Sequence, residues 1–117
     1  MRLDDLNTAL AEAEAALVAE GEANGFCTAS VEMPVGRVLT FRNQSKTWQL
    51  FIETNRDTAD ASLKLLTTTS VETRCQAVSR LPELLERIKS ARQERDAAVE
   101  VAIDQVADFL RTMRVPE

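Results

Sequence analysis

Apolar residues recur at helical spacing near the N-terminus. Four leucines and one alanine step by three and four residues, so they share one face of a helix. These positions are Leu3, Leu6, Leu10, Ala13 and Leu17. Gly21 and the pair Asn24-Gly25 are typical of a helix end. The pattern predicts a helix over residues 2–23 with a narrow apolar face.

Apolar and polar residues alternate over residues 26–33, which is typical of a half-buried strand. The side chains on its apolar face are Cys27, Ala29, Val31 and Met33. Pro34 follows directly, and because it has no N–H it ends the strand.

Residues 35–54 predict a β-hairpin. Two apolar segments flank the polar residues 43–46, which we expect to form a four-residue loop, so that Arg42 pairs with Thr47. One face of the hairpin then gathers the apolar side chains Leu39, Phe41, Trp48, Leu50 and Ile52.

Residues 55–69 begin as a polar turn and continue with three leucines that need burial, Leu63, Leu65 and Leu66. A short edge strand and an irregular packed segment both satisfy this requirement. The pattern leaves these two alternatives open.

Residues 70–113 have a helical pattern. Thr69 and Glu72 match a capping box, with Thr69 as the N-cap. Pro82 is expected to kink or restart the helix, with Ser79 as the new cap. The segment is therefore predicted as kinked helices.

The stretch from Pro82 to Met113 contains no glycine and no turn cluster. As one helix it would be about 48 Å long. A compact domain of this chain length is only about 35 Å across. The helix therefore either breaks near Ser90-Ala91 or projects from the domain, and the sequence leaves both possibilities open.

Together these elements predict a single α+β domain over residues 1–117. The N-terminal helix precedes a three-stranded antiparallel sheet that includes the hairpin. The kinked C-terminal helices pack on one face of this sheet.

A second apolar stripe lies near the end of the chain. Its members are Val99, Ile103, Val106, Leu110 and Met113, with Ala102 and Phe109 beside them. Arg92 and Arg95 separate it from the apolar positions earlier in the segment. A small monomer would leave much of such a stripe exposed. The N-terminal helix is one candidate to cover it, and the same helix of a second subunit is another. We expect a homo-oligomer.

Acidic residues recur every fourth position in the same segment and form an acidic ladder, namely Asp96, Glu100, Asp104 and Asp108. Like charges at this spacing cost a few tenths of a kcal/mol per pair. The ladder is a candidate surface for a basic protein or for a divalent cation, although metal binding would need ligands from elsewhere. A solvated helix face opposite the apolar stripe explains it better.

The composition argues against an enzyme. The 117 residues include 14 Lys and Arg, 19 Asp and Glu and no His, for a net charge of −5. The lack of His removes the commonest general base and metal ligand. The sequence also has no nucleophile motif and no Gly-rich phosphate loop. We expect no catalytic residue, no metal site and no cofactor.

The two cysteines, Cys27 and Cys75, lie far apart in the sequence and lack partner motifs. Two thiols without His cannot build a usual zinc site. We expect both to be reduced and buried, with an intrachain disulfide as the alternative.

Residues 36–64 carry five basic and three acidic side chains, together with Trp48 and Phe51. Such a set could contact nucleic acid by phosphate binding and stacking. A core tryptophan with solvated basic edge residues explains it better. We therefore do not expect a nucleic-acid partner.

No apolar run approaches the roughly 18 residues of a membrane span, and the N-terminus lacks an apolar signal segment. These features predict no membrane association and a cytoplasmic location.

Four short motifs are Leu39-x-Phe41, Trp48-x-Leu50-x-Ile52-Glu53, Ser70-x-Glu72-x-Arg74 and Leu81-Pro82-x-Leu84-Leu85. In these motifs the chain resembles small uncharacterised α+β proteins of bacteria and their phages. The resemblance implies a phage or mobile-element accessory protein. It implies no activity, cofactor or site residue.

The sequence therefore predicts a non-catalytic protein-binding or assembly protein that acts as a homo-oligomer through its helices. The alternative is a small phage-type inhibitor or sequestering protein that blocks a host enzyme or captures an anionic ligand. The hydroxyls and free N–H groups of residues 67–70, at a predicted helix start, suit an anion. A simple helix cap explains this run better.

Overall fold

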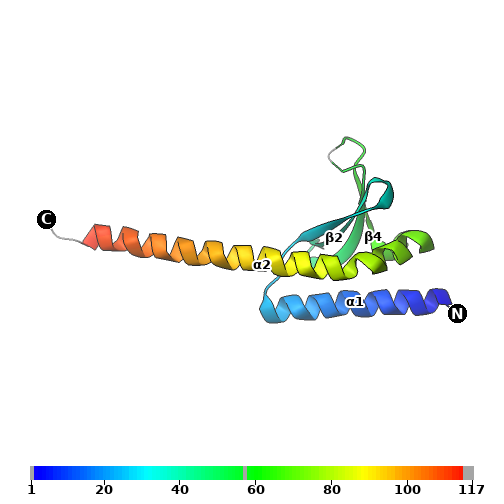
Figure 1. The fold of residues 1–117 in the computed structure, drawn as a ribbon, viewed down its shortest axis with the longest axis horizontal. Helices are drawn as coiled ribbons and strands as arrows, with labels where there is room; N and C mark the ends of the chain where they lie inside the picture. The colour runs from blue at the N-terminus through cyan, green and yellow to red at the C-terminus, as the bar shows by residue number, and fades with distance from the viewer. Residues whose placement is uncertain (1, 57, 115–117) are drawn as a thin grey trace.

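The computed structural model describes residues 2–56 and 58–114. Its elements are α1 (Arg2–Asn24), β1 (Ala29–Met33), β2 (Arg37–Gln44), β3 (Thr47–Thr54), β4 (Ser62–Leu65) and α2 (Val71–Arg114) (Figure 1). Short 3₁₀ turns at Pro34–Gly36 and Leu66–Thr68 precede β2 and α2. The predicted α+β class, N-terminal helix and antiparallel sheet are confirmed.

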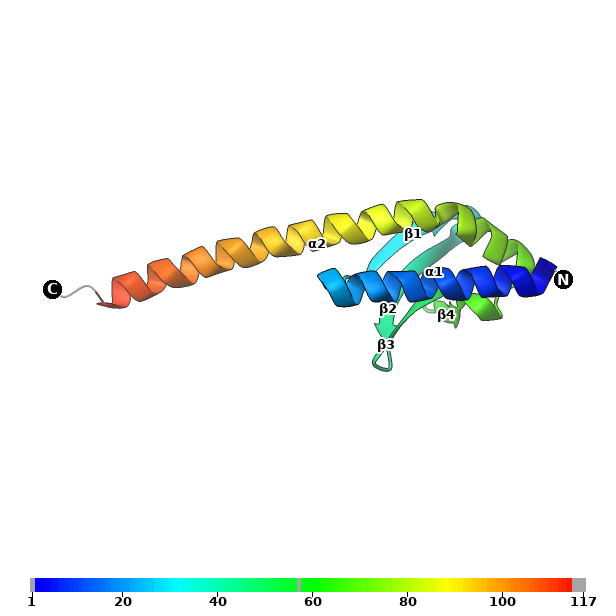
Figure 2. The ribbon, with the colours of Figure 1, turned by 90° about the horizontal axis from the view of Figure 1, so that it is seen from below.

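The globular part has two layers. The antiparallel sheet has the order β1-β2-β3-β4. The two helices lie side by side across one face of this sheet, as Figures 1 and 2 show, with α2 against β1 and β2 and α1 against β3. Both helices therefore cover the same apolar sheet face.

The core lies between the sheet and the helices. Leu10 of α1 and Leu84 and Ile88 of α2 are almost fully buried against the hairpin. The hairpin contributes Leu39, Phe41, Leu50 and Ile52, with Trp48 packed against them. The predicted apolar face of the hairpin is confirmed, whereas the Leu3 side chain of the predicted helix face lies outside the described side chains.

The hairpin register differs from the predicted one. Gln44 pairs with Thr47, so the predicted pairing of Arg42 with Thr47 is wrong and the loop contains only Ser45 and Lys46. Both loop residues have positive φ, 55° and 70°, as in a type I′ turn. The twist of this turn matches the twist of the strands, which favours it over a longer loop. A register change of two residues keeps every side chain on its predicted face.

The sheet has four strands, so the prediction of three is wrong. The extra strand is β4, which pairs with β3 so that Leu65 lies opposite Phe51. Between the two alternatives for residues 55–69, the edge strand is the one that forms. Leu66 follows it and is buried, which anchors the chain before α2.

The N-cap of α2 is Ser70 and not Thr69. The Thr73 N–H donates to the Ser70 hydroxyl oxygen at 3.2 Å, as an N-cap requires. The Thr69 hydroxyl instead donates to the Leu66 carbonyl at 2.6 Å, within the preceding turn. The helix therefore begins one residue later than the capping-box pattern predicts.

The C-terminal segment is one continuous helix, so the prediction of kinked helices is wrong. Residues 71–114 are helical through Pro82 and through Ser90. Pro82 removes one donor, which leaves the Val78 carbonyl without its helical partner. Because Val78 and Pro82 are both exposed, water can hydrate this carbonyl. Ser79 does not cap a new helix, and its hydroxyl donates to the Gln76 carbonyl at 2.7 Å.

The molecule is elongated because α2 projects beyond the globular part (Figure 1). The radius of gyration is 19.1 Å and the extents are 75 × 34 × 24 Å. A compact chain of this length would have a radius of gyration near 13 Å. Of the two possibilities for the long helix, projection is the one observed.

Both cysteines are free thiols, but only one is shielded from solvent. Cys27 is half-buried between α1 and β1, whereas Cys75 is exposed on the first turns of α2. The prediction that both are buried is wrong for Cys75, because this position faces away from the sheet.

Candidate functional site

The most unusual surface of the molecule is the distal half of α2, which we define as residues 93–114. Every residue of this segment is exposed, whereas earlier turns of α2 alternate between buried and exposed positions. At about 1.5 Å per residue the segment is about 33 Å long. Figures 1 and 2 show that no other element lies alongside it.

The predicted interaction residues lie on this segment and are uncovered. They form the distal stripe, which comprises Val99, Ile103, Val106, Leu110 and Met113 with Ala102 and Phe109 beside them. The exposed fractions of the five predicted residues range from 40% for Leu110 to 70% for Met113. Since α1 ends at Asn24 and does not reach the stripe, one of the two predicted covering elements is eliminated within a single copy.

The distal stripe has coiled-coil spacing. Val99, Val106 and Met113 are seven residues apart, and Ala102 and Phe109 fall between them at the 3–4 spacing of a heptad seam. Ile103 and Leu110 flank one side of this seam and widen it. A seam of three apolar positions per heptad is typical of helices that pack against other helices.

The distal stripe continues the face of α2 that packs on the sheet. Leu84 and Ile88, both buried in the core, precede Ala102 and Val106 by 18 residues, which is five full turns. The same side of the helix is therefore covered by the sheet in its proximal half and bare in its distal half.

Two arginines mark the place where the cover ends. Arg92 donates to the Gly25 carbonyl at 3.3 Å and pairs with Glu20 at 2.6 Å. Arg95 donates to the Phe26 carbonyl at 3.1 Å. The polar interruption noted in the sequence is thus the junction at which the turn after α1 lies against α2.

The Arg92–Glu20 pair is the strongest electrostatic contact of this junction. Its side chains are 13% and 25% exposed, less than any other ion pair in the described residues. The hydrogen bond from Arg92 lowers the pKa of the Glu20 carboxyl below its usual value, against the opposing effect of burial. The same hydrogen bond raises the pKa of Arg92. The pair therefore holds the base of the projecting helix to α1.

The acidic ladder lies on a different side of the distal half from the stripe. Asp96, Glu100, Asp104 and Asp108 are all exposed. Asp96 pairs with Arg95 at 3.3 Å and Asp108 with Arg111 at 3.0 Å. Within residues 2–56 and 58–114, no group of three or more Cys, Asp or Glu side chains is placed to hold a metal ion. The ladder is thus a solvated acidic face.

Within the distal half, the sequence analysis missed the exposed apolar residue Val101. Val101 is 56% exposed and lies beside the acidic ladder, about 140° around the helix from Val106. No apolar stripe marks it, because the residues three and four positions before it are the small Ala98 and Ala97, and those three and four positions after it are polar. Its isolation makes it useful below as a matched control for the stripe.

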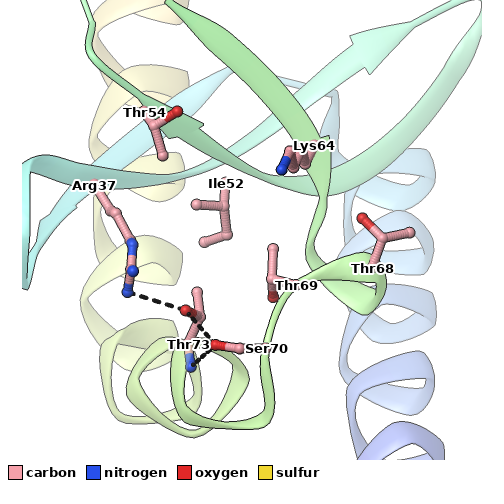
Figure 3. A pocket seen from close by; sticks show the side chains of 8 residues that line it. All are labelled: Arg37, Ile52, Thr54, Lys64, Thr68, Thr69, Ser70 and Thr73. Carbon is pink, nitrogen blue, oxygen red and sulfur yellow. Dashed lines mark hydrogen bonds between the residues drawn. The ribbon is translucent and has the colours of Figure 1, made fainter.

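A second candidate is a polar pocket of about 270 Å³ between the sheet and the first turn of α2 (Figure 3). Arg37 from β2 and Lys64 from β4 bring two positive charges to it. Its hydroxyl groups already have partners, since Arg37 donates to the Thr73 hydroxyl at 3.0 Å and that hydroxyl hydrogen-bonds with Ser70 at 2.9 Å. The positive charges of the pocket would attract an anion. The hydroxyls of Ser70 and Thr73, however, are already hydrogen-bonded at the N-cap of α2.

Trp48 of the basic hairpin packs against the core. The ring of Trp48 stacks on Phe26 with centroids 4.7 Å apart and lies 5.4 Å from the ring of Phe41. It is therefore not free to stack on a nucleic-acid base. This placement agrees with the core interpretation of Trp48.

An apolar groove of about 500 Å³ separates α1 from α2 in the globular part. Ala13 and Leu17 line one side of it, and Leu81 and Leu85 line the other. Glu20 lies at its end near the junction. The groove is a third uncovered surface, and it is acidic at its rim.

Comparisons with known proteins found no similar protein. No protein-family model, curated protein or solved structure matches this chain. Neither helix of the described part combines the length and the apolar character that crossing a membrane requires.

Proposed function

We propose that this protein is a non-catalytic assembly protein that self-associates through the distal stripe of α2. The observation that supports this proposal most directly is the bare apolar seam, which begins where the cover of the globular part ends at Arg95. A seam of this kind in water is stabilised by a partner helix.

A partner helix would add to the stability of the distal half. Helices in water gain most of their stability from packing of an apolar face, and the apolar face of this segment is unpacked in one copy. The segment gains little from its charges, because the acidic ladder places like charges four residues apart. Burial of the stripe would stabilise helix and assembly together.

The stripe is short, which limits the strength of the assembly. From Val99 to Met113 it spans about two heptads. We therefore expect a reversible dimer with a dissociation constant in the micromolar range, and not a permanent complex. Such a dimer would present two globular parts on one shared rod.

Sedimentation equilibrium of the full chain at several concentrations tests the proposal. We expect a concentration-dependent dimer, and Val106→Glu should weaken it by at least tenfold because a charge would lie in the seam. Val101→Glu is the matched control, since both valines are 56% exposed but only Val106 lies on the stripe. A strictly monomeric wild-type chain, or equal effects of the two variants, would contradict the proposal.

The acidic ladder supports a second role for such an assembly. Because Glu100, Asp104 and Asp108 of the ladder lie away from the stripe, they would remain in solvent after the helices pair. A basic protein surface is the partner that its charge favours. Together the seam and the ladder give the projecting helix one face for self-association and another for a partner.

The alternative function, sequestration of an anionic ligand, is supported by the pocket of Figure 3, which Arg37 and Lys64 both line. Inorganic phosphate would then raise the melting temperature of the full chain, and Lys64→Gln would remove the effect. The assembly proposal is favoured because the pocket hydroxyls are already paired, whereas the stripe has no partner in one copy. A monomer that binds a host enzyme through the stripe remains the other form of this alternative.

A further inference from the structure

We infer that the second copy binds the distal stripe in antiparallel orientation, so that the two globular parts lie at opposite ends of a shared helical rod. This inference rests on the proposed self-association and specifies its geometry. Three features of the chain support it: the cover at the junction, the sizes of the seam residues, and the charges at the two ends of the seam.

The cover at the junction opposes a parallel, in-register pair. The stripe lies on the same face of α2 as Leu84 and Ile88, which the sheet covers. In a parallel pair the partner helix would continue along this face past Arg95 toward the sheet. The turn at Gly25 and Phe26 already occupies that path, where it accepts hydrogen bonds from Arg92 and Arg95. In an antiparallel pair the helix α2 of the partner, which ends at Arg114, reaches this turn at its end and does not need to pass it.

The side-chain sizes favour one antiparallel register. When Val99 of one copy lies beside Phe109 of the other, Ala102 lies beside Val106. Each layer then pairs a larger side chain with a smaller one, as close packing between helices requires. This register covers the helix from Arg95 to Met113, which is the whole length of the stripe.

The charges at the two ends of the stripe agree with the same register. Asp96 and Arg114 lie on the same flank of the seam, five turns apart. A two-fold axis perpendicular to the helices brings Asp96 of one copy beside Arg114 of the other, and repeats this pair at the other end. A parallel pair would leave these opposite charges at opposite ends of the rod.

The groove between α1 and α2 is a poorer seat for the distal half of a second copy. Glu20 lines it, and α1 carries acidic residues but no basic residue in its last turn. The distal half is itself acidic over its ladder, from Asp96 to Asp108. Like charges would therefore oppose this arrangement, whereas pairing through the two distal stripes brings opposite charges together.

Crosslinking between engineered thiols tests the orientation directly. In a full chain that carries Cys27→Ser and Cys75→Ser, one variant would add Val99→Cys and the other Phe109→Cys. Both positions are exposed in a single copy, so the fold does not depend on them. With a short bis-maleimide, an equal mixture should crosslink at least tenfold faster than either variant alone. Faster crosslinking of Val99→Cys with itself would overturn the antiparallel arrangement.

A charge swap gives an independent readout. Asp96→Arg and Arg114→Asp should each weaken the dimer about tenfold in low salt, and the doubly substituted chain should return to within about threefold of wild type. Asp104→Arg makes the same change of charge far from the seam and should have a smaller effect. Failure of the double variant to recover would overturn the predicted pairing of Asp96 with Arg114.

The two proposals can fail separately. A wild-type chain that sediments as a monomer at all concentrations would overturn self-association, and the antiparallel arrangement with it. A dimer that Val106→Glu disrupts, but that crosslinks through Val99→Cys alone, would leave self-association supported and overturn only the orientation.

Discussion

At the scale of single residues, the junction between α1 and α2 depends on a few polar contacts at a place where apolar packing ends. Arg92 is the central residue, because its guanidinium binds both the Glu20 carboxylate and the Gly25 carbonyl. It stands between the buried apolar face of the proximal half of α2 and the distal stripe, at a position where an apolar residue would continue the helical pattern. Arg92 thus joins α2 to α1 where the distal half begins, and it interrupts the apolar pattern of α2 at this position.

We predict that Glu20→Gln lowers the stability of the chain by about 1 kcal/mol at pH 7. The hydrogen bond from Arg92 lowers the folded-state pKa of Glu20 below its unfolded value. Its stabilisation is therefore complete above the unfolded pKa and is lost as the pH falls through the folded pKa. Urea denaturation of both proteins from pH 7 down to pH 3 measures the difference, which should shrink toward acid.

The control for this prediction is Glu22→Gln, which removes an exposed carboxylate two residues further along α1. It should leave both the stability at pH 7 and its acid dependence nearly unchanged. A stability difference between wild type and Glu20→Gln that stays constant down to pH 3 would contradict the role of the ion pair.

At the scale of elements, periodic patterns identified faces more reliably than ends and registers. The apolar face of the hairpin was predictable because any shift by two residues preserves it. The pairing of Gln44 with Thr47 was not, because it depends on Ser45 and Lys46 adopting positive φ, which neither residue type favours. Tertiary packing of the strands overrides that local preference.

The predicted start of α2 and the predicted kink at Pro82 were wrong for a similar reason. Ser70 and the threonines before it are all good caps, so the sequence offers several equivalent starts for α2. Leu66 decides between them, because its burial fixes the turn before the helix. Pro82 likewise has the chemistry of a helix break, yet the packing of Leu84 and Ile88 on the sheet keeps α2 continuous.

We predict that Pro82→Ala stabilises the protein by about 1–3 kcal/mol. Alanine restores the hydrogen bond to the Val78 carbonyl and has the highest helix propensity. Little packing is lost, since Pro82 is exposed. The urea midpoint should rise without a change in the slope of the transition. Ser90→Ala, at another exposed position of the same helix, is the control and should give a smaller increase. A lower midpoint for Pro82→Ala would show that the proline contributes to the native packing.

At the scale of the whole molecule, the sequence predicted that an apolar surface lacks a cover and could not predict what covers it. The stripe is evident from Val99 to Met113, and so is the excess length of the helix. Whether α1 reaches back over it depends on where α1 ends and turns, which is decided by the contacts of Arg92 and Arg95. Those contacts join residues about 70 positions apart, and no local pattern encodes them.

Small-angle X-ray scattering distinguishes the shapes that follow from these arrangements. One copy is 75 Å long, and two copies that overlap over about 30 Å of helix give a particle of about 120 Å. We predict this maximum dimension at high concentration, falling toward that of one copy on dilution. A dimer no longer than a single copy would indicate that the rods lie in parallel or fold together.

Because α2 is one continuous helix, the direction in which the distal stripe faces depends on the number of residues between the globular part and the stripe. Inserting a single alanine between Arg95 and Val99 would lengthen the arm by only about 1.5 Å but rotate everything beyond it by about 100°. Inserting seven would add about 10 Å and return the seam almost to its original bearing. We therefore expect natural variation in the length of the projecting helix to occur in steps close to whole turns, such as about 7, 11 or 18 residues, because other lengths would turn the apolar stripe away from the partner helix.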